Sequence, residues 1–513
     1  MNNGYSPYNQ RFVPRQVMRQ SAPPKNDGNG IWNRKTILPK WLSTYSVMGY
    51  VLALAIVTLM YTSHSLQWYY MLSGVMSIVI FFFYGAHLAE KTSIVKMHRN
   101  IRFERQIFLV SFVLRVAWMA LIYTIFMQNY GDAFGFESGD ALYYDELGQF
   151  VAGKIERGDF HFYDEISQWS GNRDIADMGY GIYVGFVYWL TGNSIIAVRL
   201  LKCIWSAWTV LLIYRLAKRN FGEQTGRIAA IFVALWPNFW YYSGTHLKEV
   251  EMTFLAVLFV EQAEQMLRSR QFTTWKLIPI LLVAAAMFTF RTILGIVALL
   301  ALVFAVVMAS SRVMTWGKRV IVGFLAILLI GVTAGNRIQE QASQLYEQVN
   351  SGQQKENMEW RAKRKDGNTF ARYAGTAVFA PLIFTLPFPT MTLSSESQDL
   401  QQLLNGGNFI KNIMSAFTIL AMFSLLLSGK WREHMLSLAF MLGYLVVLTM
   451  SAYAQSGRFH QPVVPFELMF AAYGLSVALT KAKYKRWFTY WCMLMVVAAV
   501  AWNWFKLAGR GLV

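Results

Sequence analysis

Residues 277–310 read LIPILLVAAAMFTFRTILGIVALLALVFAVVMAS and carry a single charged side chain, that of Arg291. An α-helix needs about 20 apolar residues to cross the roughly 30 Å hydrocarbon core of a bilayer. This run is too long for one crossing, so it predicts two spans joined by a tight external turn at Arg291. Backbone polar groups in lipid must be satisfied within their own segment, so the spans are expected to be helical.

The rest of the chain has the same character. Hydrophobic residues make up 55% of the 513 positions and charged residues 15%, whereas a soluble domain has about 25% charged residues. Similar apolar runs recur, and they predict an all-α polytopic membrane protein with about 11–13 transmembrane helices. Cys203 and Cys492 both lie in apolar segments and show neither disulfide nor metal-ligand spacing.

The net charge of +19 does not indicate nucleic-acid binding, because the basic residues lie in loops between apolar spans. That distribution follows the positive-inside rule for cytoplasmic loops. Residues 1–40 are basic and rich in Asn, Gln, Gly and Pro, which predicts a disordered cytoplasmic tail. Residues 41–513 are expected to form one transmembrane domain.

A polar segment at residues 128–193 interrupts the apolar pattern. Its first part, residues 128–178, has eleven acids against Lys154, Arg157 and Arg173, and it includes Gly139-Asp140-Ala141-Leu142-Tyr143-Tyr144-Asp145-Glu146. The basic loop before the preceding span places this acidic segment on the non-cytoplasmic side. Residues 336–408 form a second large loop on that side. Clustered carboxylates at the face of a membrane bundle favour chemistry on a lipid-linked substrate.

Four polar features reach this external face: Asp140 with Asp145 and Glu146, the run His246-Leu247-Lys248-Glu249, Arg291, and Arg458 with His460. Ionisable groups at membrane depth cost a few kcal/mol each, so they are rarely without a role. A carboxylate can take the proton of an attacking hydroxyl. Arginine and lysine can hold a phosphate leaving group. The combination suggests group transfer from a lipid phosphate or diphosphate to an acceptor hydroxyl.

These motifs resemble the GT-C superfamily of integral-membrane glycosyltransferases, which use polyprenyl-phosphate-linked sugars. Members carry an acidic residue early in the first external loop, often followed by a tyrosine, and Asp140 with Tyr143 and Tyr144 is similar to this. The resemblance covers about residues 130–300 and 455–475. It includes, in order, Leu190-Thr191-Gly192-Asn193-Ser194, Ala197-Val198-Arg199-Leu200, Phe221-Gly222, Trp236-Pro237, Glu249 and Arg458-Phe459-His460-Gln461-Pro462 with Pro465.

The resemblance implies a GT-C bundle with two large external loops, similar to protein mannosyltransferases and aminoarabinose transferases. It implies an inverting glycosyltransferase that serves cell-envelope glycan or glycolipid synthesis. Asp140 and Glu249 are the catalytic candidates. Substrate contacts are expected from Tyr144, Asp145, His246, Lys248, Arg291, Arg458 and His460. Gly139-Asp140-Ala141 replaces the Asp-Glu pair of some branches, which leaves open whether a divalent cation is needed, and no metal ligands are assigned.

Each candidate also has a structural interpretation. Asp140 could cap the helix that follows it. The negative charge of Glu249 could interact favourably with the positive N-terminal end of its own helix. Lys248 and His246 could anchor the interface, while Arg291 and Arg458 could form ion pairs within the bundle. Asp145 and Glu146 are expected to face water.

Other functions remain open on the sequence. A polysaccharide polymerase or ligase typically relies on arginine and histidine in a large late loop, and the loop at residues 336–408 leaves this alternative open. A transporter or flippase would place its charges near mid-membrane and often show repeats, and a scaffold would need no catalytic charge. The expected partners are the lipid-linked donor, a glycan, lipid or protein acceptor, and membrane lipids. A bacterial inner membrane with a cytoplasmic N-terminus is the expected location.

Overall fold

The fold is taken from a computed structural model. The structure describes residues 38–92, 101–135, 139–161, 165–166, 175–269, 274–308, 316–317, 320–328, 331, 382–393, 402–449, 454–480 and 483–513. Nearly all of the tail expected at residues 1–40, and most of the loop expected at 336–408, lie outside these ranges. Among the described residues, the β pairing consists of an isolated bridge between Ser65 and Thr392.

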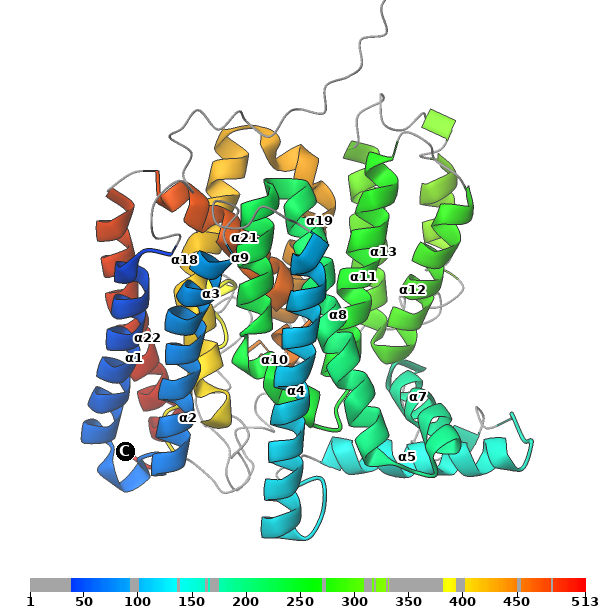
Figure 1. Ribbon diagram of the computed structural model, residues 1–513, viewed down its shortest axis with the longest axis horizontal. Coiled ribbons are helices and arrows are strands. Elements are labelled where there is room, and N and C mark those ends of the chain that lie inside the picture. The colour runs from blue at the N-terminus through cyan, green and yellow to red at the C-terminus, as the bar shows by residue number, and fades with distance from the viewer. Residues whose placement is uncertain are drawn as a thin grey trace, which may run out of the picture.

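Helices form almost all of the described structure (Figure 1). They are α1 (Lys40–Met60), α2 (Trp68–Val79), α3 (Gly85–Lys91), α4 (Ile101–Tyr130), α5 (Gly139–Glu156), α7 (Ile175–Thr191), α8 (Ile195–Phe221), α9 (Glu223–Ala234), α10 (Pro237–Gly244), α11 (Glu249–Arg268), α12 (Leu277–Phe290), α13 (Thr292–Met308), α18 (Asn405–Leu427), α19 (Met435–Thr449), α20 (Gly457–His460), α21 (Val464–Ala478) and α22 (Lys483–Ala508).

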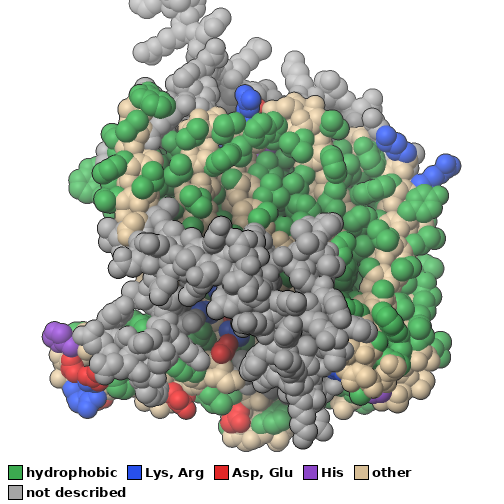
Figure 2. Space-filling model, turned by 180° about the vertical axis from the view of Figure 1, so that it is seen from behind, with side chains coloured by type: hydrophobic (Ala, Val, Ile, Leu, Met, Phe, Trp, Pro, Cys, Tyr) green, Lys and Arg blue, Asp and Glu red, His purple; other side chains and the backbone are tan. Residues whose placement is uncertain are grey.

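Six helical stretches in the described part are long and apolar enough to cross a membrane: Lys40–Met60, Trp68–Lys91, Phe103–Tyr130, Ile195–Phe221, Asn405–Leu427 and Lys483–Ala508. Shorter apolar helices lie beside them, namely α12, α13 and α21. Hydrophobic side chains cover a broad band of the molecule, and acidic side chains gather toward one edge (Figure 2). The expected all-α polytopic membrane fold is therefore confirmed.

Two helix breaks interrupt the bundle, and the first lies at Arg291, where the sequence predicts a turn. Arg291 has extended backbone angles (φ −164°, ψ 112°) and separates α12 from α13. The second break precedes Pro237, which begins α10 after α9 has ended at Ala234. A proline cannot donate a helical hydrogen bond, so the last carbonyls of α9 need other partners.

Arg115 of α4 supplies those partners. Its side chain is fully buried, and its guanidinium donates to the carbonyl of Val233 at 3.4 Å and to that of Ala234 at 3.5 Å. The indole of Trp240 also donates to the Ala234 carbonyl, at 2.5 Å. The break in α9–α10 is thus stabilised by a cation from a neighbouring helix.

The acidic segment folds into two helices that lie against one end of the bundle. α5 lies across that end, whereas α11 runs along the bundle, and α7 packs on α5 (Figure 1). Glycines permit the close approach, because a Cβ at Gly185 would lie 3.1 Å from the carbonyl oxygen of Gly148. The apolar residues 179–190 are too few to cross a bilayer as one helix, and they lie within α7.

α18 and α21 pack closely against each other. A Cβ added at Gly474 of α21 would overlap the carbonyl oxygen of Phe417 in α18. Small residues allow the backbones of membrane helices to approach each other in this way.

We expect Gly474→Ala to lower the free energy of unfolding by about 1–3 kcal/mol, because the added methyl group overpacks a rigid backbone contact. The measurement is the thermal unfolding midpoint of the purified protein in detergent. Gly153→Ala is the matched control, since nothing lies within 4 Å of its Cβ position in α5, and it should match or slightly exceed wild-type stability. Equal midpoints for the two variants would contradict the close packing.

Candidate active site

One arginine joins segments that are far apart in the chain. The Nη1 group of Arg458, in α20, donates to Oδ2 of Asp140 in α5 at 2.6 Å, and its Nε donates to Oε1 of Glu249 at the start of α11. The partners are separated from Arg458 by 318 and 209 positions. Three residues selected from the sequence are therefore in direct contact at one end of the bundle.

The two carboxylates differ in their access to solvent. The Asp140 side chain is 48% exposed, whereas that of Glu249 is 1% exposed and that of Arg458 is 18% exposed. Burial opposes the charge of Arg458, but Glu249 and Asp140 more than offset this and raise the pKa of Arg458 above its ordinary value. The guanidinium is therefore a permanent cation, and Asp140 is the carboxylate that a substrate can reach.

A second arginine lies beside the first. The guanidinium carbon of Arg291 is 4.2 Å from the ring centroid of Phe459, and that of Arg458 is 6.0 Å from the same centroid. In the part of the chain that the structure describes, the Arg291 side chain has no carboxylate or hydrogen-bond partner. Its guanidinium has five N–H donors. Within the described structure these donors therefore have no protein acceptor.

Lys248 and Tyr144 lie behind the carboxylates. The Lys248 ammonium donates to the backbone oxygen of Phe290 at 2.9 Å, which links the start of α11 to the residue before Arg291. It also lies 5.6 Å from the ring centroid of Tyr144, and both side chains are buried. Tyr144 packs edge to face against Tyr180. These contacts pack the residues around the carboxylates against one another.

The expectation that Asp145 faces water is wrong. Its side chain is buried and accepts hydrogen bonds from the Tyr188 hydroxyl in α7 and from Gln149, the latter at 2.8 Å. Glu146, one residue later, is exposed as expected. Adjacent residues on a helix point about 100° apart, and α7 covers the face that carries Asp145.

Both candidate histidines are buried. His246 lies among the rings of Phe134, Tyr180 and Tyr188. Burial, followed by the positive charges of Lys202 and Arg199, lowers the pKa of His246 well below its ordinary value, so its imidazole is neutral. His460 points away from Asp140 and contacts Lys411 and the Ala454 carbonyl.

Metal binding was left open by the sequence. Among the described residues, no group of three His, Cys, Asp or Glu side chains lies close enough together to hold a metal ion.

Sequence reasoning did not identify two buried pairs of a lysine and a glutamate. Lys202 of α8 donates to the Leu247 carbonyl and lies 3.7 Å from the carboxylate of Glu251 in α11. A similar pair, Lys411 and Glu467, joins α18 to α21 at 3.2 Å. The available signal was a charged residue inside an otherwise apolar span, which is the signal that selected Arg291.

A family model described as dolichyl-phosphate-mannose-protein mannosyltransferase matches residues 181–334. The matched region includes His246, Lys248, Glu249 and Arg291, whereas Asp140 and Arg458 lie outside it. No match was found among the curated proteins. The family match confirms the resemblance to GT-C membrane glycosyltransferases and supports an enzyme that transfers a sugar from a polyprenyl-phosphate donor.

We expect Arg458→Met to lower the free energy of unfolding by about 3–5 kcal/mol, because it leaves the buried carboxylate of Glu249 without a counter-charge. The double variant Arg458→Met/Glu249→Leu should recover much of that loss, since no unpaired buried charge remains. Thermal unfolding in detergent distinguishes the two variants. Equal unfolding midpoints would show that Glu249 does not depend on Arg458.

Proposed function

We propose that the protein is an inverting glycosyltransferase that moves a sugar from a polyprenyl-phosphate or diphosphate donor to an acceptor hydroxyl. The observation that carries this proposal is the Arg458 bridge between Asp140 and Glu249, with Arg291 beside it. It combines an accessible carboxylate with a cation available for phosphate. The family match supports the donor class.

In the proposed reaction Asp140 is the general base. Arg458 holds its Oδ2, so Oδ1 can take the proton of the acceptor hydroxyl. The acceptor oxygen then forms a bond to the anomeric carbon of the sugar from the face opposite the phosphate. The bond between that carbon and the phosphate oxygen breaks, and the electron pair leaves with the polyprenyl phosphate. A single displacement of this kind inverts the anomeric configuration.

Arg291 is the proposed contact to the leaving group. Guanidinium N–H groups bind phosphate through charge-assisted hydrogen bonds, and they stabilise the charge that develops on the departing oxygen. Glu249 is too buried to meet an acceptor, so we assign it the role of holding Arg458.

An apolar groove provides a path for the donor's isoprenoid tail. It has a volume of about 490 Å³ and runs between α13, α18 and α19, with Val297, Leu300, Phe304, Leu438 and Leu442 among its lining residues. Val297 follows Arg291 by six residues, which is about 9 Å along a helix. A phosphate held by Arg291 would therefore place its tail near the start of the groove.

We place the site on the non-cytoplasmic side. α11 begins at Glu249 and ends at Arg268, and the far end of the bundle carries Arg215, Lys218, Arg219, Arg268, Lys430 and Arg432. Basic residues mark the cytoplasmic side of membrane proteins. This supports an external site, with a bacterial inner membrane as the proposed location.

The first test is transfer of radiolabelled sugar from a panel of polyprenyl-phosphate-linked donors, in membranes that contain the protein. We expect Asp140→Asn to reduce kcat by about 10²–10⁴-fold, because asparagine keeps the shape but cannot accept the proton. Asp159→Asn is the matched control, since Asp159 pairs with Lys154 on an exposed loop and should not affect transfer. A folded Asp140→Asn protein with wild-type kcat would favour a polymerase or ligase that uses other residues.

The second test concerns the leaving group. Arg291→Gln should raise the donor KM by about 10- to 100-fold, which corresponds to the roughly 1.5–3 kcal/mol of a charge-assisted hydrogen bond. The acceptor KM should change little. Arg157→Gln is the control, because Arg157 is exposed at the end of α5. An unchanged donor KM in Arg291→Gln would remove Arg291 from the phosphate site.

A further inference from the structure

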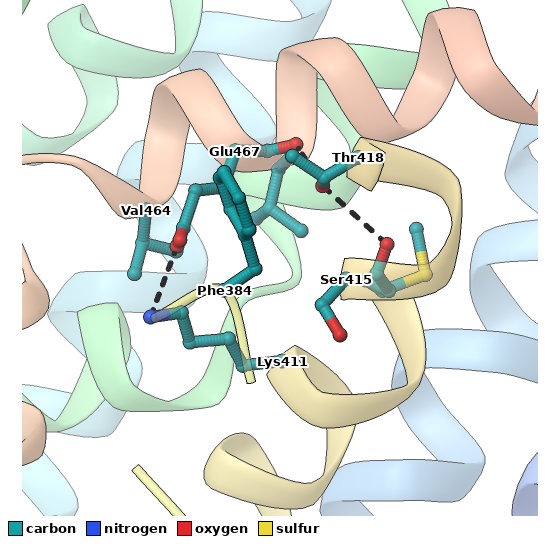
Figure 3. Close-up of a pocket in the computed structure, with 8 residues that line it drawn as sticks. Phe384, Lys411, Ser415, Thr418, Val464 and Glu467 are labelled. Carbon is teal, nitrogen blue, oxygen red and sulfur yellow. Dashed lines mark hydrogen bonds and ion pairs between the residues drawn. The ribbon is translucent and has the colours of Figure 1, made fainter. Parts of the chain in front are cut away.

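A buried ion pair lies behind the Arg458 turn. Lys411 of α18 and Glu467 of α21 point toward each other (Figure 3), with 3.2 Å between Nζ and Oε2. Their side chains are 4% and 6% exposed. Neither residue has a part in the proposed chemistry, because neither reaches the open face beside Asp140.

Lys411 contacts three separate segments. Besides Glu467, its ammonium meets Nδ1 of His460 at 2.8 Å and donates to the backbone oxygen of Leu386 at 2.5 Å. The ammonium therefore has two hydrogen-bond partners, and the Glu467 carboxylate beside it supplies the counter-charge. One side chain of α18 therefore holds α20, α21 and the segment at Leu386 together.

The contact with Lys411 determines which ring nitrogen of His460 carries the proton. Lysine can only donate, so Nδ1 of His460 must accept, and the ring proton is on Nε2. That proton is donated to the backbone oxygen of Ala454 at 2.8 Å. Burial, followed by the charge of Lys411, lowers the pKa of His460 well below its ordinary value and keeps the ring neutral. His460 thus closes the turn between Ala454 and α20.

Arg458 lies within that closed turn, two residues before His460 in the same short helix. The turn has further backbone contacts from Gln461 to Arg458 and from Val463 to His460. The neighbouring Asn412 donates to the Pro387 carbonyl at 3.0 Å, which fixes the adjoining segment against α18. The direction of the Arg458 side chain therefore depends on how Lys411 holds His460.

The space around the ion pair is too small for a substrate. A cavity of about 10 Å³ lies beside Lys411 and Glu467, lined also by Ser415, Thr418 and Phe384 (Figure 3). This volume is enough for about one water molecule. Stability alone also fails to account for the pair, because well-packed apolar residues often stabilise a fold as well as a buried ion pair does.

We propose that Lys411 and Glu467 are positioning residues, which act through His460 to direct the Arg458 guanidinium at Asp140 and Glu249. This inference rests on the proposed sugar transfer for its catalytic part. Its structural part, a turn held by Lys411, can be tested without any substrate.

The central variant is Lys411→Met/Glu467→Leu, which replaces the ion pair by apolar side chains of similar size. We expect a folded protein with an unfolding midpoint near that of wild type and a donor KM within about twofold. The kcat should fall at least tenfold, because Arg458 no longer holds Asp140 in place. Loss of stability with proportionate loss of all activity, or an unchanged kcat, would overturn the inference.

The matched control is Glu104→Leu/Arg215→Met. It removes an ion pair of 2.7 Å at the opposite end of the bundle, so its kcat should equal that of wild type. A double-mutant cycle with Arg458→Lys adds a sharper criterion. If the pair acts through Arg458, its removal should lower kcat little further in the Arg458→Lys background. If the two effects are independent, the fold losses in kcat multiply, and this result would contradict the inference.

Hydrogen exchange tests the turn directly. In Lys411→Met/Glu467→Leu, the backbone amides of residues 457–461 and of Val463 should exchange faster than in wild type, while those of α12 remain unchanged. Unchanged exchange in the turn overturns the inference even if no donor has been identified, and faster exchange supports it even if sugar transfer is absent. If this variant does not accumulate, His460→Leu replaces it, because leucine can neither accept a hydrogen bond from Lys411 nor donate one to Ala454. The same exchange and kcat criteria apply to it.

Discussion

The arrangement of this protein depends on the two hydrogen-bonded ion pairs that the Arg458 guanidinium makes with Asp140 and Glu249. A cation with little exposure to water needs counter-charges in contact with it. These come from the first helix of the acidic segment and from the start of α11, on either side of the site. The acidic segment is thereby attached to the bundle through the same contacts that form the candidate active site.

Buried cations also stabilise the irregular parts of the bundle. Arg115 satisfies the carbonyls left free where α9 stops before Pro237, and Lys411 binds the Leu386 carbonyl and the His460 ring. Irregular backbone at membrane depth is tolerated only where the protein satisfies its polar groups. At both places a long basic side chain from a neighbouring helix donates to the carbonyls of the irregular backbone.

Much of this could be predicted from the sequence, since hydropathy indicated the fold class and the turn at Arg291. Charge between the apolar spans selected Asp140, Glu249 and Arg458, which are in contact, and Arg291, which lies against the neighbouring Phe459. The burial of Asp145 and of both histidines could not be predicted, because it depends on which helix covers which face. Contacts such as Lys411–Glu467 join distant helices, and no local spacing in the sequence encodes them.

The orientation of α5 has a geometric consequence. Because this helix lies across the end of the bundle while α11 runs along it (Figure 1), Asp140 is held at a fixed height relative to the spanning helices. In the proposed reaction, an acceptor anchored in the bilayer would have to bring its hydroxyl to this end of the bundle, whereas a water-borne acceptor would approach from the exposed α5 surface.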